Sequence, residues 1–332
     1  MKKDIQLCGL GNGLVDIQYE VSDDELKNLK LKKGEMRLVE NDEQRKLIDK
    51  FAHRKHHKSS GGSAANTVIA FSLLGGKAAY KTTLGNDKFG LFYAKEFTDL
   101  GIVLKARLID THPTGTCFVF VTPDSERTMN TSLGASAEFG EAEIDEEIIA
   151  RSEWLYIEGY KFTQENSTLA VYKAVDLAKK QGTKIAVTFS DSFITEIFKD
   201  NLKKTAEMAD LIFCNENEAQ SYTGKKDTAE AYKELKRIAP NVIVTKSEAG
   251  SLIHWNGGDV EVPAYKTIPV DSTGAGDMYA GAFLYGIINT GSPAKAGHLA
   301  SYAASRIVSQ FGARLIENII PEKDRIFREI DC

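Results

Sequence analysis

The chain has 332 residues, of which 42% are hydrophobic, so it is long enough to bury one large core or two ordinary ones. Its net charge of −5 comes from 42 basic residues mixed with 47 acidic ones, which argues against a nucleic-acid partner and favours a small molecule. No run of about 18 apolar residues predicts a membrane span. The four scattered cysteines, Cys8, Cys117, Cys214 and Cys332, favour a reducing cytoplasm over a disulfide framework.

The chain opens with two strands separated by glycines. A buried strand is predicted at residues 5–10, then the turn Gly11-Asn12-Gly13 and a second strand at 14–21. Because a strand follows the glycines and a third glycine is missing, we reject a dinucleotide-binding fingerprint. Asp16 lies on the second strand, where its carboxylate can accept hydrogen bonds from a hydroxylated ligand. A solvated edge charge is the ordinary alternative for a lone acid.

The next segments continue with short elements. Ser22 followed by Glu25 is a capping-box pattern, which predicts a helix over 22–31. A strand at 36–39 and a helix at 42–51 follow. Residues 52–58 are rich in histidine and lysine but lack cysteines and carboxylates, so they predict a solvated loop and not a metal site.

Gly61 and Gly62 precede a predicted helix at 64–74. Two glycines at a helix start allow a ligand to approach backbone amides, although a plain flexible loop with an N-cap explains the local pattern equally well.

After a strand at 78–82 and a helix at 90–100, strand-like pieces follow with no helix between them. These pieces are residues 103–109, 116–122 and 127–131. We therefore assign them to a small β-rich lid formed by residues 13–40 and 106–133. The remaining residues, 1–12, 41–105 and 134–332, are predicted to form the core.

Beyond residue 134 strands and helices alternate, which indicates an α/β fold with a mostly parallel sheet. The predicted strands are 154–157, 185–189, 211–214 and 242–245, and the predicted helices are 167–181, 195–204, 216–223 and 228–239. A hairpin is predicted over 251–263 and a helix over 294–310, which Ser292 and Pro293 begin.

The most informative stretch is the run Asp271-Ser272-Thr273-Gly274-Ala275-Gly276-Asp277. Apolar residues continue at helical spacing to Asn289, so a helix is predicted to begin inside this run, with its first N–H groups open to an anion. A carboxylate would repel a merely bound phosphate. Asp277 is therefore interpreted as a general base beside a phosphoryl group, and the ordinary alternative is that it compensates the helix dipole.

This run and its helix resemble the C-terminal signature of the ribokinase-like (PfkB) family of carbohydrate and nucleoside kinases. The run Gly61-Gly62-Ser63-Ala64-Ala65-Asn66 resembles the N-terminal signature of that family. Further segments resemble the adenosine kinase branch, namely residues 11–16, 113–117, 159–160, 191–193 and 210–219. The resemblance spans residues 4–316 and implies an αβα three-layer core with a small β lid. No Walker motif is present, which argues against a P-loop kinase.

The resemblance implies a phosphotransferase that uses ATP and Mg²⁺ and acts on a primary hydroxyl of a nucleoside, adenosine first. The alternatives are a furanose sugar, inosine or guanosine kinase, and a nucleoside-binding regulatory protein without activity. A cytoplasmic monomer or homodimer in purine salvage is expected.

The resemblance also implies roles for individual residues. The implied catalytic groups are Asp277, the amides of Gly274, Ala275 and Gly276, and Arg127, which would reach the transferring phosphoryl group. The implied acceptor contacts are Asn12, Asp16, Gly62, Asn66, Met129, Thr131 and Phe193. The implied nucleotide contacts are Asn215, Thr245, Ser247, Gly250 and Ala304, and Glu218 would hold magnesium through water. For Asn215 and Glu218, simple helix capping is the alternative.

Lys161 departs from the resemblance. It stands where adenosine kinases carry an aromatic residue that stacks on the base, between Tyr160 and Phe162. A lysine removes a stacking face and offers a cation to a carbonyl or sugar oxygen. Alternatively, it points to solvent, and Tyr160 or Phe162 stacks on the base instead.

Overall fold

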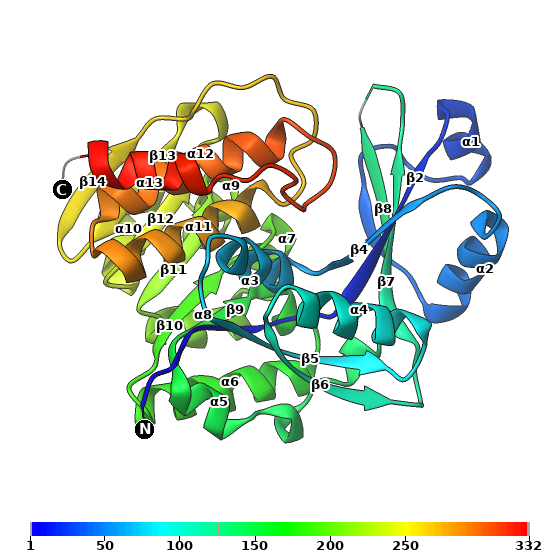
Figure 1. Cartoon of the computed structure of the whole chain (residues 1–332), viewed down its shortest axis with the longest axis horizontal. Coiled ribbons are helices and arrows are strands. Elements are labelled where there is room, and N and C mark those ends of the chain that lie inside the picture. The colour runs from blue at the N-terminus through cyan, green and yellow to red at the C-terminus, as the bar shows by residue number, and fades with distance from the viewer. Residues whose placement is uncertain (1, 125, 331–332) are drawn as a thin grey trace.

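The structure, a computed structural model, describes residues 2–124 and 126–330, so Cys332 lies outside the described residues. These residues form two sheets, which stand side by side in Figure 1. The larger sheet contains β1 (Ile5–Leu10), β5 (Ala78–Gly85), β6 (Val103–Ile109), β9 (Ser152–Glu158), β10 (Lys184–Thr188), β11 (Leu211–Asn215), β12 (Val242–Thr245), β13 (Ser251–Trp255) and β14 (Gly258–Val262). The smaller sheet contains β2 (Leu14–Glu20), β3 (Met36–Leu38), β4 (His57–Gly61), β7 (Thr114–Val121) and β8 (Arg127–Gly134).

The strand order of the larger sheet is β14-β13-β12-β11-β10-β9-β1-β5-β6, and that of the smaller one is β3-β8-β7-β2-β4. Pairing in the larger sheet is parallel from β6 to β12, and β13 and β14 add an antiparallel hairpin. The helices are α1 (Asp23–Asn28), α2 (Asn41–Phe51), α3 (Ser63–Leu73), α4 (Lys88–Asp99), α5 (Glu146–Arg151), α6 (Glu165–Lys180), α7 (Ser192–Ile197), α8 (Lys199–Met208), α9 (Glu216–Thr223), α10 (Thr228–Ile238), α11 (Ala275–Thr290), α12 (Pro293–Val308) and α13 (Ile320–Glu329).

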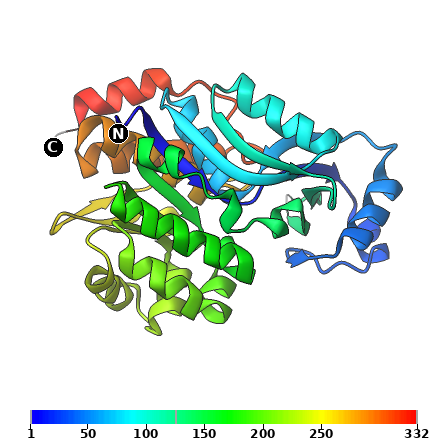
Figure 2. The same ribbon diagram turned by 90° about the horizontal axis from the view of Figure 1, so that it is seen from below.

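Helices cover both faces of the larger sheet (Figure 2). Successive strand residues point to opposite faces, so the strands feed two cores. Leu7 and Tyr156 pack with α3, α11 and α12 on one face, whereas Cys8 and Leu155 pack with α6 and α10 on the other. The predicted α/β fold with three layers is confirmed.

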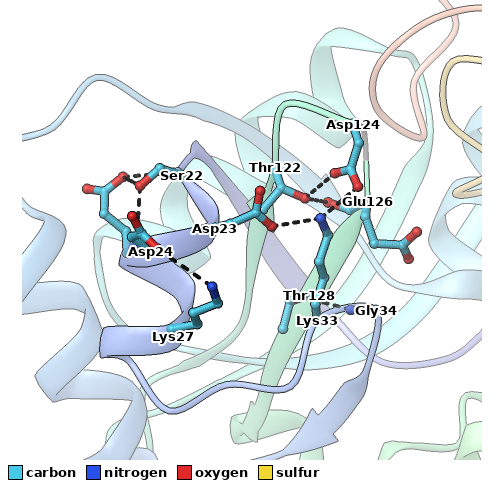
Figure 3. Close-up of polar contacts among 11 residues, drawn as sticks. Ser22, Asp23, Asp24, Lys27, Lys33, Gly34, Thr122, Asp124, Glu126 and Thr128 are labelled. Atoms are coloured by element: carbon cyan, nitrogen blue, oxygen red, sulfur yellow. Dashed lines mark hydrogen bonds and ion pairs between the residues drawn. The ribbon is translucent and has the colours of Figure 1, made fainter.

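At its outer end the smaller sheet is joined to α1. The capping box of α1 forms as predicted, since the Ser22 hydroxyl accepts from the Glu25 amide and the Glu25 carboxylate accepts from the Ser22 amide. Lys33 then bridges Asp23 at 2.8 Å and Asp124 at 2.7 Å (Figure 3). It therefore ties α1 to the turn between β7 and β8.

Three sequence predictions need correction. Residues 103–109 were assigned to the lid as strand-like pieces, but β6 pairs with β5 at the edge of the larger sheet. One side of β6 is exposed, at Val103, Lys105 and Arg107, so its alternating pattern resembles that of a half-exposed lid strand. The solvated loop predicted at 52–58 ends in β4, whose first residues are exposed. The helix predicted at 195–204 is interrupted at Phe198, between α7 and α8.

In the described chain, the backbone passes between the two sheets four times. The crossings join β1 to β2, β4 to α3, β6 to β7, and β8 to the residues after Gly134. Gly62 and Gly134 have φ values of 104° and 48°, which only glycine adopts readily. Within the described residues, no helix is long and apolar enough to cross a membrane.

Candidate active site

The N-terminus of α11 lies inside the glycine motif, as the sequence predicted. The helix begins at Ala275, and Gly274 caps it with a φ of 74°. A side chain on Gly274 would collide with Ala313. The Ala275 amide donates to the Ser272 carbonyl at 3.2 Å, but the described residues supply no acceptor for the Gly276 amide. Gly276 is exposed, with open space where a side chain would stand. This helix start can therefore receive an anion.

Asp277 lies in the first turn of α11 and joins the two glycine-rich signatures. Its Oδ1 accepts from the Ser63 hydroxyl at 2.7 Å, and its Oδ2 accepts from Asn66 Nδ2 at 3.1 Å. Burial raises the pKa of Asp277 to about 6, and these two hydrogen bonds oppose that rise. The carboxylate is therefore ionised at neutral pH and is still a stronger base than an exposed carboxylate.

A pH profile tests this assignment. The acceptor kcat/KM is expected to fall as the pH drops below about 6, because protonated Asp277 cannot take a proton. Ser63→Ala removes a hydrogen bond that lowers this pKa, so the inflection should move to higher pH. Steady-state rates measured on both sides of pH 6 show both effects. An inflection near pH 6 that Ser63→Ala leaves in place would contradict the assignment, whereas titration of Asp16, whose pKa is about 7, should be alike in both proteins.

Asp16 lies on β2, and its carboxylate faces Gly61 on the neighbouring strand β4, where any side chain would collide with it. Burial raises the pKa of Asp16 to about 7, and the charges of Arg314 and Arg127 oppose that rise. The described residues donate no hydrogen bond to this carboxylate. Both oxygens are therefore free to accept from a ligand, and the contact with acceptor hydroxyls stays a prediction.

Arg127 begins β8 and reaches from the smaller sheet to the glycine motif. It forms an ion pair with Asp271, in which the two side chains are 9% and 2% exposed. Asp271 also accepts from the amides of Thr273 at 3.0 Å and Gly312 at 2.7 Å. The predicted partner of Arg127 was a phosphoryl group. In the structure it binds a carboxylate of the motif itself.

Glu158 ends β9 and holds the two N-terminal glycine segments together. Its fully buried carboxylate accepts from the amides of Asn12 and Ala64, each at 2.8 Å. Burial raises the pKa of Glu158, and the two amides and Lys161 oppose that rise. One side chain therefore fixes the turn at 11–13 against the start of α3.

Asn215 and Glu218 form the capping box of α9. The Asn215 side chain accepts from the Glu218 amide at 2.9 Å, and Glu218 accepts from the Asn215 amide and side chain. The capping alternative is thus observed. Burial, together with the charges of Asp191 and Asp277, raises the pKa of Glu218 to about 7, and the hydrogen bond from the Asn215 amide opposes that rise. This accumulation of negative charge fits a nearby divalent cation, although the described residues contain no cluster of three metal-binding side chains.

The predicted nucleotide contacts lie along the same edge of the larger sheet. Thr245 ends β12 beside Asn215 of β11, at the carboxyl ends of parallel strands where open sheets bind ligands. Ser247 and Gly250 follow with φ values of 49° and 86°. Ala304 is partly buried on α12. Their contacts with a nucleotide stay predictions.

The predicted acceptor contacts come from several elements. Asn12, Gly62 and Asn66 meet at the start of α3, since the Asn66 amide donates to the Gly62 carbonyl at 2.8 Å. Met129 and Thr131 lie on β8, where the Thr131 hydroxyl donates to Cys117 Sγ at 3.3 Å.

Phe193 has two aromatic neighbours among the described residues, Tyr160 and Phe198, with ring centroids 6.2 and 6.1 Å away. Phe162 is fully buried in the core and offers no ring to a ligand. Lys161 is only 1% exposed, so the alternative that it points to solvent is wrong.

Sequence reasoning missed three residues of this site. Ser63 lies inside the quoted motif at 61–66, so its hydroxyl could have been singled out there. Glu158 is an acid that ends an otherwise apolar strand, which is a weak signal of function. Arg314 donates to the Ser60 carbonyl at 2.7 Å, and nothing local in the sequence predicts that contact.

Comparison with known proteins identifies the family of this chain. A family model for pfkB family carbohydrate kinases matches residues 27–319. The chain belongs to this family. It is therefore a sugar or nucleoside kinase, a phosphotransferase with an alcohol group as its acceptor.

Relatives within the PfkB family differ in their acceptors. The chain is similar to the adenosine kinase of Saccharomyces cerevisiae, with 28% identity over 302 residues, 85% of this chain and 88% of that one. It is also similar to the 5-dehydro-2-deoxygluconokinase of Listeria monocytogenes, with 30% identity over 285 residues, 81% and 86% of the two chains.

Two crystal structures of bacterial kinases match the fold. A probable sugar kinase from Rhizobium etli CFN 42 has a TM-score of 0.90 at 29% identity, over 98% of this chain and 99% of that one. The adenosine kinase from Sinorhizobium meliloti has a TM-score of 0.89 at 31% identity, over 97% and 99%. The predicted family and ribokinase-like fold are confirmed.

Proposed function

We propose that this PfkB-family kinase transfers the γ-phosphoryl group of ATP to the 5′-hydroxyl of a nucleoside, adenosine first. The observation that carries the proposal is Asp277, a half-buried carboxylate beside an open helix N-terminus that Ser63 and Asn66 link to the N-terminal signature. The relatives named as adenosine kinases support a nucleoside. A furanose sugar is the second candidate, because Lys161 replaces a stacking aromatic residue and other relatives are sugar kinases.

In the proposed reaction, Asp277 takes the proton of the primary hydroxyl as its oxygen attacks the γ-phosphorus. The new P–O bond forms in line with the bond to ADP, which breaks. The amides of Gly274, Ala275 and Gly276 stabilise the developing charge, although the amide of Ala275 must share its donor with Ser272. Asp16 accepts from acceptor hydroxyls and so orients the attacking group.

The nucleotide would lie along the carboxyl ends of β11 and β12, against Thr245, Ser247 and Gly250, with Ala304 beside the adenine. Asn215 and Glu218 would hold Mg²⁺ through its waters, and bound Mg²⁺ would neutralise phosphate charge. Arg127 lies beside the motif and can exchange Asp271 for a phosphoryl oxygen.

The deciding experiment is ATP turnover with a panel of adenosine, inosine, guanosine and furanose sugars. We expect the highest kcat/KM with adenosine. Phosphorylation of sugars but of no nucleoside would refute the acceptor and leave the kinase mechanism intact. Binding of adenosine without turnover of any acceptor would instead favour a regulatory protein.

Replacing Phe193 tests the aromatic part of the acceptor pocket. Phe193→Ala should raise the acceptor KM, because stacking contributes roughly 0.5–1.5 kcal/mol beyond area burial. The ATP KM serves as the internal control and should stay unchanged. An acceptor KM equal to that of wild type would show that Phe193 does not contact the base.

A further inference from the structure

Lys161 lies next to the acceptor residues, but its ammonium group is already engaged by the protein. Nζ donates to Asn12 Oδ1 at 3.0 Å, lies 3.5 Å from the Ser136 carbonyl oxygen, and stands 4.3 Å from the centre of the Phe139 ring. A lysine has three N–H donors and no acceptor. The hydrogen bonds to Asn12 and Ser136 and the contact with the Phe139 ring surround this ammonium group, and the side chain is 1% exposed. Of the predicted acceptor contacts, Lys161 hydrogen-bonds Asn12.

Asn12 is held at every polar atom except one. Its amide donates to Glu158 at 2.8 Å, and its carbonyl accepts from the Tyr80 hydroxyl at 2.9 Å. Because Lys161 can only donate, it can only meet the oxygen end of the Asn12 side chain, which fixes the position of Nδ2. Asn12 is 4% exposed, and Nδ2 has no acceptor in the described chain while keeping contact with solvent. When a bound ligand displaces that solvent, one of its atoms must accept from this donor.

We infer that Lys161 determines acceptor specificity by orienting the Asn12 amide so that Nδ2 donates to the substrate. This inference rests on the proposed function, in which Asn12 contacts the acceptor. The inference assigns recognition of the acceptor to two side chains, Asn12 and Asp16, which lie four residues apart in the sequence. The Asp16 carboxylate binds hydroxyl donors when it is ionised, whereas Asn12 binds an atom that can only accept. The substrate class is a furanoside that carries such an atom, either the ring oxygen or an unprotonated nitrogen of the base.

Asn12→Asp is the sharpest test, because aspartate has the same shape and keeps an oxygen for Lys161 but replaces the donor with a second acceptor. We expect the acceptor KM to rise about tenfold or more, with the ATP KM unchanged. Lys161→Met removes the hydrogen bond that orients Asn12, so the acceptor KM should rise a few-fold with little change in kcat. Lys184→Met is the matched control, since Lys184 also lies over an aromatic ring, that of Trp154, but at the start of β10.

The ligand series locates the atom that Asn12 binds. Adenosine is compared with its carbocyclic analogue and with 3-deaza- and 7-deazaadenosine, each of which lacks one acceptor atom. Wild type should discriminate against at least one analogue about tenfold, and Asn12→Asp should lose that discrimination. Equal discrimination by the two proteins, or an unchanged acceptor KM in Asn12→Asp, overturns the inference. So does a folded Lys161→Met variant that behaves like Lys184→Met.

Failure of the proposed function gives a different result. Wild type would then phosphorylate a sugar and no nucleoside. The same variants would be assayed with that sugar and its deoxy analogues, and an unchanged KM in Asn12→Asp would again overturn the inference. If Lys161→Met does not fold, the Asn12→Asp comparison still decides whether Nδ2 contacts the substrate.

Discussion

Asp277→Asn is expected to lower kcat by about 10²- to 10⁴-fold while ATP still binds. The amide keeps the size and shape of the carboxylate, and its oxygen can still accept from the Ser63 hydroxyl. It cannot take a proton from the attacking hydroxyl, so only the chemical step should be lost. Turnover is measured with the best acceptor, and ATP binding is measured by calorimetry.

The matched control for this variant is Asp210→Asn. Asp210 lies at the start of β11, far from the glycine motif, and accepts from the Ile185 amide at 2.8 Å. The same chemical change there should leave kcat within a few-fold of wild type. A folded Asp277→Asn protein with comparable activity would rule out Asp277 as the general base.

Asp16→Ala should weaken acceptor binding by roughly 1–3 kcal/mol, because ligand hydroxyls buried against it lose their acceptor. ATP affinity should not change. The described residues donate no hydrogen bond to Asp16, so its removal leaves no protein donor unsatisfied, and the fold should persist. Calorimetric titration with each ligand separates the effects. Equal losses for both ligands would assign Asp16 a role in the fold.

The sequence was most informative where a local pattern determines a local structure. The capping box at Ser22, the start of α11 inside the glycine motif and the alternation of strands and helices all follow from spacing over a few residues. β6 was misassigned because an edge strand has one exposed face and is followed by no helix. β6 belongs to the larger sheet because it pairs with β5. The sequence of one strand alone does not identify the strand with which it pairs.

Contacts between residues far apart in the chain could not be predicted from the sequence. Lys161 could be seen to replace an aromatic residue, but its partner Asn12 lies 149 positions away. The ion pair of Arg127 with Asp271 joins the smaller sheet to the glycine motif in the same way. The partner of a buried charged group depends on how the elements are arranged in space. The residue type shows only that a buried charged group needs a partner.

The four crossings between the two sheets have a thermodynamic consequence. Two of them carry predicted acceptor contacts, at the turn 11–13 and at Gly62. A rotation of one sheet against the other must change the backbone at these crossings and therefore the contacts with the acceptor. Acceptor affinity and sheet orientation are thus linked reciprocally: an acceptor that favours one orientation is itself bound more tightly in it. Residues 11–13 and Gly62 would act as hinge and acceptor contact at once, so any closure of the smaller sheet over the core is expected to depend on the acceptor that is bound.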